Sequence, residues 1–201
     1  MFPLESNDLH DYLTETDEID YSDAAIAALA NELYDAGRSE IDFVKAAYEY
    51  VRDRIAHSWD IQGLRVTCAA SDVLRYREGI CYAKSNLLAA LLRSKGVPAG
   101  FAYQRLTLGD TPDTGYAIHA LNAVRISSLN RWIRLDARGN KDGIDAQFSL
   151  GQEQLAFAIR DHYDEVDYKT IYARPHPDTI AVLKRSTNVP DMYLNRLPSR
   201  L

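Results

Sequence analysis

The sequence predicts an α+β protein in which helices come first and antiparallel strands follow. Apolar residues recur at helical spacing in the first half of the chain. After Gly96-Val97-Pro98 the spacing changes to every second residue, which is typical of strands. The strands expected at 118–126 and 131–137 are joined by the short segment 127–130, which suits an antiparallel hairpin.

Length and composition fit one globular domain. A chain of 201 residues can bury a full core, and 46% hydrophobic with 26% charged residues is ordinary for a soluble protein. We expect a single domain over 1–201 with its core at about 39–150. An acidic N-terminal arm at 1–20 and a C-terminal extension at 160–201 flank that core.

Charge and hydropathy argue against several classes of partner. A formal net charge of -6 gives the chain no overall attraction for nucleic acid or anionic lipid. No apolar run reaches membrane-spanning length, and residues 1–8 lack the basic and apolar regions of a signal peptide. We therefore expect a cytoplasmic protein with no nucleic-acid or membrane partner, and its oligomeric state stays open.

Three helices are expected before the glycine at position 79. They cover 24–36, 39–55 and 70–74, the last as a short capped helix. Ser39 and Asp42 form a capping-box pattern at the start of the second helix. These helices and the loops between them would border whatever follows position 79.

The most distinctive helix begins at Cys81. Gly79 lets the backbone turn sharply just before it, and the run of helix formers ends at Gly96. The residues over 87–92 are apolar in every direction, which indicates a buried helix. Unpaired N–H groups at a helix start favour a thiolate, so Cys81 is a candidate nucleophile. The alternative is a small core residue, as most unpaired cysteines are.

The second cysteine, Cys68, is expected to be buried and inert. A reducing compartment argues against a disulfide with Cys81. Neither cysteine has the second Cys or His pair nearby that a zinc site requires, so we expect no metal site.

A nucleophilic thiol needs a base and a group that orients the base, and His119 and Asp136 are the candidates. In a hairpin that turns at 127–130, position 121 faces 136, so His119 lies two positions away and a diagonal contact with Asp136 is reasonable. An aspartate there would hold the imidazole in one tautomer. The alternatives are a strand histidine bonded elsewhere and a turn aspartate.

The pattern weakens beyond Gly143. An edge strand and a helix are expected within 148–159, and a helix over 179–184, whereas 163–172 is mixed acidic and aromatic and receives no assignment. The proline-containing tail is expected to wrap the body, and a further hypothesis is that it covers the cleft.

Together these residues resemble a known family. Gly79-Ile80-Cys81 and the leucine-rich helix after it are followed by His119-Ala120 and by Trp132 to Ala137. Over about 44–137 the pattern resembles the bacterial transglutaminase-like superfamily. The resemblance implies a papain-like fold, with N-terminal helices packed on an antiparallel sheet and the nucleophile at the start of the central helix.

The resemblance also implies roles for single residues. Cys81 would be the nucleophile, His119 the general base and acid, and Asp136 the orienting member of a catalytic triad. The segment 51–59 looks like the family's upstream element, where an aromatic residue often stands near the oxyanion site, although His57 here takes a place where tyrosine is common.

Acyl transfer needs hydrogen-bond donors aimed at the developing oxyanion, and the backbone N–H of Cys81 is a natural first one. The second could be His57, Trp59 or Gln62, and the sequence does not choose among them. For each of the three the alternative is a packing or capping role.

We therefore expect a thiol-dependent acyl-transfer enzyme that forms a thioester on Cys81 from an amide or peptide bond. Hydrolysis, as by a cysteine peptidase or amidase, is favoured because water is abundant and transamidation requires an added amine site. The alternatives are protein-glutamine transamidation and a non-catalytic binding or scaffold domain that keeps the fold. The expected partner is a protein, peptide or small amide substrate. No cofactor or metal is expected, since no calcium-loop pattern is present.

Overall fold

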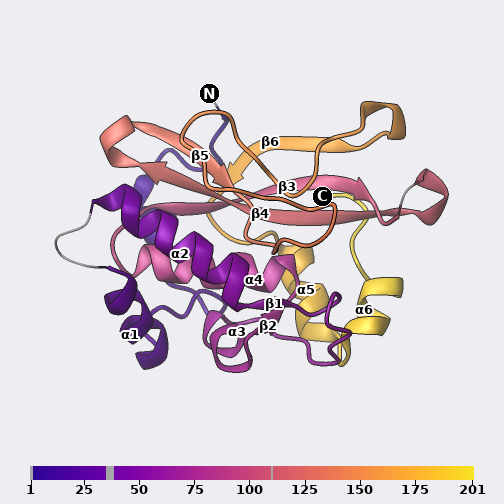
Figure 1. Ribbon diagram of the computed structural model, residues 1–201, viewed down its shortest axis with the longest axis horizontal. Helices are drawn as coiled ribbons and strands as arrows, with labels where there is room; N and C mark the ends of the chain where they lie inside the picture. Colours follow the sequence, from indigo (N-terminus) through magenta and orange to yellow (C-terminus); the bar gives the residue numbers. More distant parts are fainter. Residues whose placement is uncertain (1, 35–38, 110) are drawn as a thin grey trace.

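An antiparallel sheet lies over a layer of helices in the computed structural model, which describes residues 2–34, 39–109 and 111–201 (Figure 1). The strands of this sheet are β3 (Ala99–Thr107), β4 (Tyr116–Ile126), β5 (Arg131–Leu135) and β6 (Val166–Tyr172). Their order in space is β5-β4-β3-β6, and each neighbouring pair is antiparallel. The predicted α+β class is confirmed.

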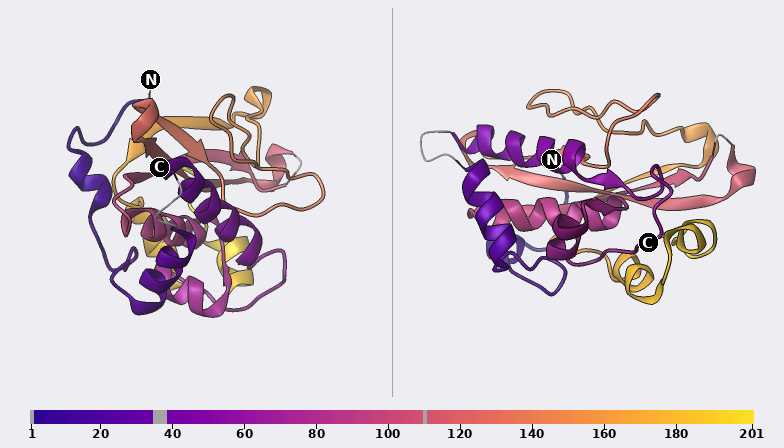
Figure 2. Two further views of the ribbon diagram at one scale, coloured as in Figure 1. Left: turned by 60° about the vertical axis from the view of Figure 1, so that its left-hand side comes forward. Right: turned by 60° about the horizontal axis from the view of Figure 1, so that its bottom comes forward.

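The helices of the described residues are α1 (Ala24–Leu33), α2 (Glu40–Arg54), α3 (Ala70–Tyr76), α4 (Cys81–Arg93), α5 (Pro177–Arg185) and α6 (Val189–Asn195). The capping box expected from Ser39 and Asp42 is present at the start of α2. The left view of Figure 2 shows the C-terminal helices, drawn in yellow, on the same side of the sheet as the helices of the first half.

Helix α4 runs through the centre of the molecule. Its residues 82–93 are all buried, and it packs against α1, α2, α3, β3 and β4. Because the helix is apolar nearly all round, contact on every side removes the most apolar surface from water. It ends as the sequence predicts: Gly96 has a φ of 72°, and the Val97 N–H donates to the Leu92 carbonyl. The helix is a rigid mount for its first residue, Cys81.

Lys84 ties α4 to the end of α2. The residue is 1% exposed, and its Nζ donates to the Ile55 carbonyl at 2.5 Å, one residue past the end of α2. Burial, with a contribution from the positive charge of Arg138, lowers the pKa of Lys84 to about 7. The contact fixes the point at which the chain leaves α2.

Two short strands follow from that exit point. β1 (Ala56–His57) pairs in parallel with β2 (Glu78–Gly79), and this pairing sets His57 opposite Gly79. Because Gly79 stands two residues before Cys81, the segment after α2 is brought to the start of α4. The upstream element therefore borders Cys81, as expected.

The predicted register of the β4–β5 hairpin is confirmed. Asn122 pairs with Leu135, which is the alignment that places position 121 opposite 136. The turn contains a short 3-10 segment and ends at Asn130, whose φ is 51°. Since β5 stops at Leu135, Asp136 leaves the sheet beside the His119 end of β4.

The edge strand and helix expected within 148–159 are wrong. The segment forms neither, and near it only Gln147 and Gln154 are bridged. Its backbone is held by side chains instead: the Ala156 N–H donates to the Asp136 carboxylate at 3.0 Å. Apolar residues here pack against distant parts of the chain, as Phe148 does against Tyr48, rather than forming one helix face, so their spacing was misleading.

Among the elements that were not predicted are β6 and α6, whereas the helix expected at 179–184 is confirmed as α5. β6 is an edge strand that is half exposed, so acidic and aromatic residues mix along it without clean alternation. α6 is short, although Asn188 caps it by accepting from the Asp191 N–H at 2.8 Å.

The acidic arm at 1–20 is anchored more firmly than an exposed arm would be. Tyr12 and Ile19 are fully buried, and Leu4 forms a bridge with Ile171 of β6. The apolar residues scattered among the acidic ones are the anchors, and the acidic side chains between them remain mostly exposed.

Two helix boundaries also differ. The helix expected over 24–36 ends at Leu33, and positions 35–38 lie outside the described residues. The helix expected over 70–74 is α3, which begins at Ala70 as expected but continues to Tyr76 and has no side-chain cap.

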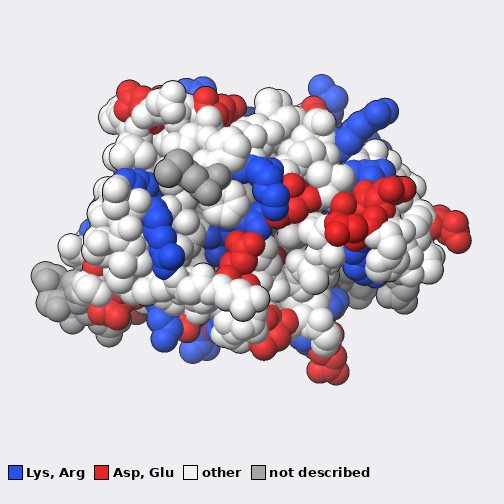
Figure 3. All heavy atoms as spheres, turned by 90° about the horizontal axis from the view of Figure 1, so that it is seen from above, with Lys and Arg blue, Asp and Glu red and all other residues white. Residues whose placement is uncertain are grey.

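On the face shown in Figure 3, acidic and basic side chains are mixed rather than segregated. None of the helices in the described ranges is long and apolar enough to cross a membrane.

Close packing at Gly100 makes a test of the sheet. A Cβ added there would lie 2.7 Å from the Tyr172 carbonyl oxygen and 3.0 Å from Tyr12. We expect Gly100→Ala to lower the free energy of unfolding by about 2 kcal/mol or more, measured by urea denaturation, because β6 and the arm must move apart. Gly151→Ala is the control, since its nearest neighbour is 3.9 Å away. Equal midpoints for the two variants would contradict the packing.

Candidate active site

Cys81 is the first residue of α4, and nothing caps the helix in front of it. Ile80 occupies the N-cap position and makes no side-chain cap hydrogen bond. The first N–H groups of the helix therefore have no partner within it. They leave the sulfur in a positive backbone field, with donors available to an oxygen that bears negative charge.

His119 and Asp136 form a direct, buried pair. Nε2 of His119 lies 2.8 Å from Oδ2 of Asp136, and the two side chains are 7% and 0% exposed. The expected diagonal contact across the hairpin is present. Because Nε2 faces the aspartate, Nδ1 is the ring nitrogen left for Cys81, which lines the same cleft as His119.

Backbone groups hold the Asp136 carboxylate in place. Oδ1 accepts from the Arg138 N–H at 3.2 Å, and Oδ2 accepts from the Ala156 N–H at 3.0 Å as well as from His119. A carboxylate bonded in this way cannot rotate freely, so it fixes the tautomer and the plane of the imidazole.

The electrostatics of the pair favour its ionised form. Burial would lower the pKa of His119, but the Asp136 carboxylate and the Cys81 side chain outweigh burial and raise that pKa to about 10. Burial would raise the pKa of Asp136, yet the facing His119 holds it below its ordinary value. An imidazolium beside a sulfur is the arrangement that stabilises a thiolate.

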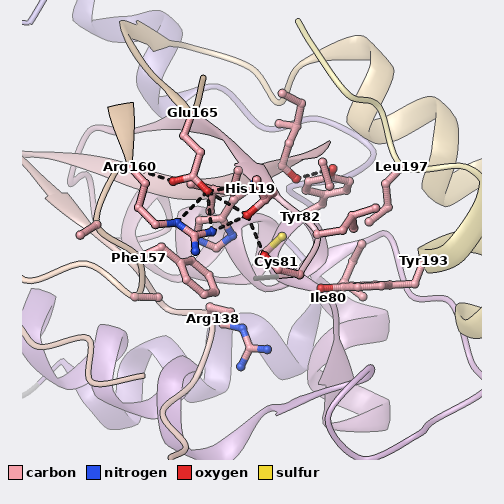
Figure 4. Close-up of a pocket in the computed structure, with 18 of the residues that line it drawn as sticks. Ile80, Cys81, Tyr82, His119, Arg138, Phe157, Arg160, Glu165, Tyr193 and Leu197 are labelled. Atoms are coloured by element: carbon pink, nitrogen blue, oxygen red, sulfur yellow. Dashed lines mark hydrogen bonds and ion pairs between the residues drawn. The ribbon is translucent and has the colours of Figure 1, made fainter. Parts of the chain in front are cut away.

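A cleft of about 510 Å³ opens at Cys81 and His119 (Figure 4). Much of its wall is apolar and is built by Leu106, Leu108, Ile118, Phe157 and Leu197. The Phe157 ring stands edge-on to the His119 imidazole, with centroids 5.2 Å apart. The wall excludes water from one side of the histidine and provides room for a substrate chain.

The charged groups of the cleft are paired. Arg138 donates through both terminal nitrogens to Asp60, at 2.5 and 2.9 Å, and Arg160 lies 2.7 Å from Glu165. Although burial alone would raise the pKa of Asp60, hydrogen bonds from Arg138 and Lys141 hold it at about 2. The cleft therefore carries little net charge of its own.

The three residues considered as second oxyanion donors lie around the cleft rather than in its wall. His57 is buried, and burial with the charge of Arg138 holds its pKa well below the ordinary value, so it is neutral. Trp59 stacks on Tyr193, with ring centroids 4.3 Å apart at 13°. Gln62 is exposed, and its amide donates to the Trp59 carbonyl at 2.7 Å.

Sequence reasoning missed several lining residues. Arg138 lies two positions after Asp136, and this nearness in sequence was the only indication that it lines the cleft. Phe157 lies in an irregular segment, and Tyr193 belongs to the unassigned helix α6. Neither has a neighbour pattern that would place it here, because the contacts that bring them in are tertiary.

Comparison with known proteins identifies the family to which the chain belongs. Residues 27–137, more than half of the chain, match the sequence profile of the Transglutaminase-like superfamily. The chain belongs to this superfamily. Cys81, His119 and Asp136 all fall within the matched residues, whereas the C-terminal residues of the cleft fall outside them. No protein with a curated description is significantly similar in sequence.

One solved structure supports the fold assignment. A candidate cysteine protease from Cytophaga hutchinsonii is 20% identical, with a TM-score of 0.52 over 66% of this chain and 43% of its own. The periplasmic domain of TgpA from Pseudomonas aeruginosa is 21% identical, with a TM-score of 0.48 over 66% of this chain and 48% of its own. This chain thus matches less than half the length of either structure. The transglutaminase-like, papain-like core expected from the sequence is confirmed.

Within the described ranges, no group of three or more His, Cys, Asp or Glu side chains is arranged to hold a metal ion.

The carboxylate of Asp136 should control the ionisation of His119. We expect Asp136→Asn to lower the pKa of His119 by about 2 pH units, because it removes the opposite charge that most raises it. The histidine should then be neutral at pH values where the unaltered protein still holds an imidazolium. Nitrogen-15 NMR of the imidazole across a pH titration measures this directly.

Asp145→Asn is the matched control for that titration, since Asp145 is exposed and contacts Asn140, Gln147 and Gln154 rather than the histidine. A His119 titration that is the same in all three proteins would contradict the pairing.

Proposed function

We propose that this protein is a cysteine-dependent acyl-transfer enzyme that hydrolyses an amide or peptide bond. The observation that carries the proposal is the buried Asp136–His119 pair, joined at 2.8 Å, whose histidine lines the same cleft as a cysteine that begins a helix. The substrate class is a protein, a peptide or a small amide, because the cleft is large enough for part of a chain and its charged groups are paired.

The reaction begins with the thiolate of Cys81 and the imidazolium of His119. The sulfur attacks the carbonyl carbon, a C–S bond forms, and the carbonyl electron pair moves to oxygen. The resulting oxyanion is stabilised by the Cys81 N–H at the start of α4. When the intermediate collapses, the C–N bond breaks and His119 gives its proton to the departing amine. A thioester remains on the sulfur.

Deacylation reverses the proton movements. Water attacks the thioester carbon while His119 accepts a proton from it. The C–S bond then breaks, releasing a carboxylic acid and regenerating the thiolate and imidazolium. Asp136 keeps the imidazole oriented in both steps and stabilises its positive charge, without itself taking the proton.

The pH dependence of iodoacetamide alkylation tests the thiolate–imidazolium pair. At about pH 6.5, Cys81 should react about 10- to 100-fold faster in the unaltered protein than in His119→Ala, which lacks the cation beside the sulfur. Mass spectrometry assigns the label to each cysteine. Cys68 is the internal control, because burial raises the pKa of its thiol to about 11.

Two results would contradict the proposed activity and favour a non-catalytic binding domain. One is a Cys81 that stays inert to iodoacetamide, and the other is a reaction whose pH profile is the same with and without His119. Either would mean that the fold is kept without a working nucleophile.

Partition of the acyl group tests hydrolysis against transamidation. After acetylation of Cys81 by p-nitrophenyl acetate, we expect the thioester to decay to acetate, with little acetyl amide formed when a small primary amine is added in millimolar excess. The physical reason is that water needs no binding site whereas an amine does. Chromatography of the two products gives the ratio, and Cys81→Ala corrects for reaction at other groups. A predominance of the amide would assign transamidation instead.

A further inference from the structure

The polar side chains that line the cleft are nearly all occupied by partners within the protein. The Tyr82 hydroxyl donates to the Ile118 carbonyl at 2.7 Å, and the Thr107 hydroxyl donates to the Gly109 carbonyl at 2.7 Å. Both terminal nitrogens of Arg138 donate hydrogen bonds to the Asp60 carboxylate. None of these groups is free to turn toward a substrate without breaking an existing bond.

Tyr193 is the exception in the wall of the cleft. Among the described residues, its hydroxyl group makes no hydrogen bond. Figure 4 shows the ring reaching in from the C-terminal side with its hydroxyl end directed toward Cys81. The charge of Cys81 is also one of the influences on the Tyr193 phenol, which places the two groups within electrostatic reach.

The ring of Tyr193 is held in this direction by aromatic contacts. One of its faces stacks on Trp59, with centroids 4.3 Å apart at 13°, and it stands edge-on to His57 at 6.4 Å and 89°. Both partners belong to the upstream element that the sequence had indicated as a source of oxyanion donors. The element thus positions a donor instead of supplying one.

The backbone around α6 is fixed as well. The Val189 N–H donates to the Leu64 carbonyl at 3.0 Å, and the Pro198 carbonyl accepts from the Ile118 N–H on β4 at 2.8 Å. Contacts on both sides of Tyr193 therefore attach α6 to the body of the protein. A donor placed on such a segment is preorganised, which is the condition for strong stabilisation of a transition state.

We propose that the Tyr193 hydroxyl is the second oxyanion donor, acting with the backbone N–H of Cys81 on the carbonyl oxygen of the substrate. This inference rests on the proposed function. As the C–S bond forms and the carbonyl electron pair moves to oxygen, the phenol donates a hydrogen bond to that oxygen and keeps its proton. When the intermediate collapses, the electron pair returns to carbon and the hydrogen bond weakens.

The phenol remains a donor over the pH range in which a thiolate–imidazolium pair operates. Burial, with the charge of Cys81 adding to it, raises the pKa of Tyr193 to about 12. The hydroxyl is therefore protonated throughout, so it can donate whenever the nucleophile is competent.

Two reactions at the same sulfur separate this role from a general effect on the cysteine. Iodoacetamide alkylates Cys81 by displacing iodide from a tetrahedral carbon, so no oxyanion forms. p-Nitrophenyl acetate acetylates it through a tetrahedral intermediate, so an oxyanion forms and p-nitrophenolate leaves. A donor to the oxyanion accelerates the second reaction and leaves the first unchanged.

Tyr193→Phe removes the hydroxyl and keeps the ring that stacks on Trp59. We expect it to slow acetylation of Cys81 by about 10- to 100-fold, in keeping with the loss of one oxyanion donor, while alkylation changes by less than about twofold. Tyr76→Phe is the matched control, because Tyr76 lies on α3 at a partly exposed position and contacts Arg65 and Arg75 rather than the cleft. It should leave both rates unchanged.

The outcomes are distinct from those that test the enzyme itself. Equal acetylation rates for Tyr193→Phe and the unaltered protein, with alkylation still dependent on His119, would overturn the role of the tyrosine and leave the acyl-transfer proposal intact. Faster alkylation of the variant would overturn it too, because the hydroxyl would then be a cap on the sulfur. If alkylation and acetylation of Cys81 were both equally fast in the unaltered protein and in His119→Ala, both proposals would be overturned.

Discussion

Burial of α4 on every side sets the position of Cys81, the proposed nucleophile. The helix packs between the other helices and the sheet, so its first residue, Cys81, has no freedom beyond its own side-chain rotation. Elements that touch α4 acquire fixed positions relative to the sulfur: β4 carries His119, and the Lys84 contact defines where the upstream segment begins. A helix that is packed on every side therefore fixes the positions of the site residues more firmly than a loop would.

The sheet brings Asp136 to His119 through the register of the β4–β5 hairpin and the point at which β5 ends. A hairpin that pairs Asn122 with Leu135 must deliver Asp136 to the neighbourhood of His119, and the strand has to end there for the carboxylate to turn toward the ring. The irregular segment that follows completes the setting, since the Ala156 N–H donates to the same carboxylate. Loss of regular structure over 148–159 is therefore part of how the histidine is held.

Elements and site residues could be predicted from the sequence where the pattern that indicates them is local. Cys81, His119 and Asp136 were within reach because a helix start, a strand and a hairpin register are local patterns, and family motifs reinforce them. The edge strand β6 was missed because half-exposed strands alternate poorly, and the second donor was sought in the upstream segment. That segment does border the cleft, but the free hydroxyl stands on Tyr193, and only tertiary packing brings α6 to Trp59.

The docking of α6 on Trp59 gives the active site an order of assembly. The three groups of the triad lie within the span matched by the superfamily, and the chain has emerged through Asp136 well before Tyr193 is made. A partly synthesised chain therefore contains Cys81, His119 and Asp136 while the part of the cleft wall built by Tyr193 and Leu197 is still missing. Under the proposed function, full reactivity toward acyl groups would therefore arise only after α6 has docked on Trp59, late in synthesis.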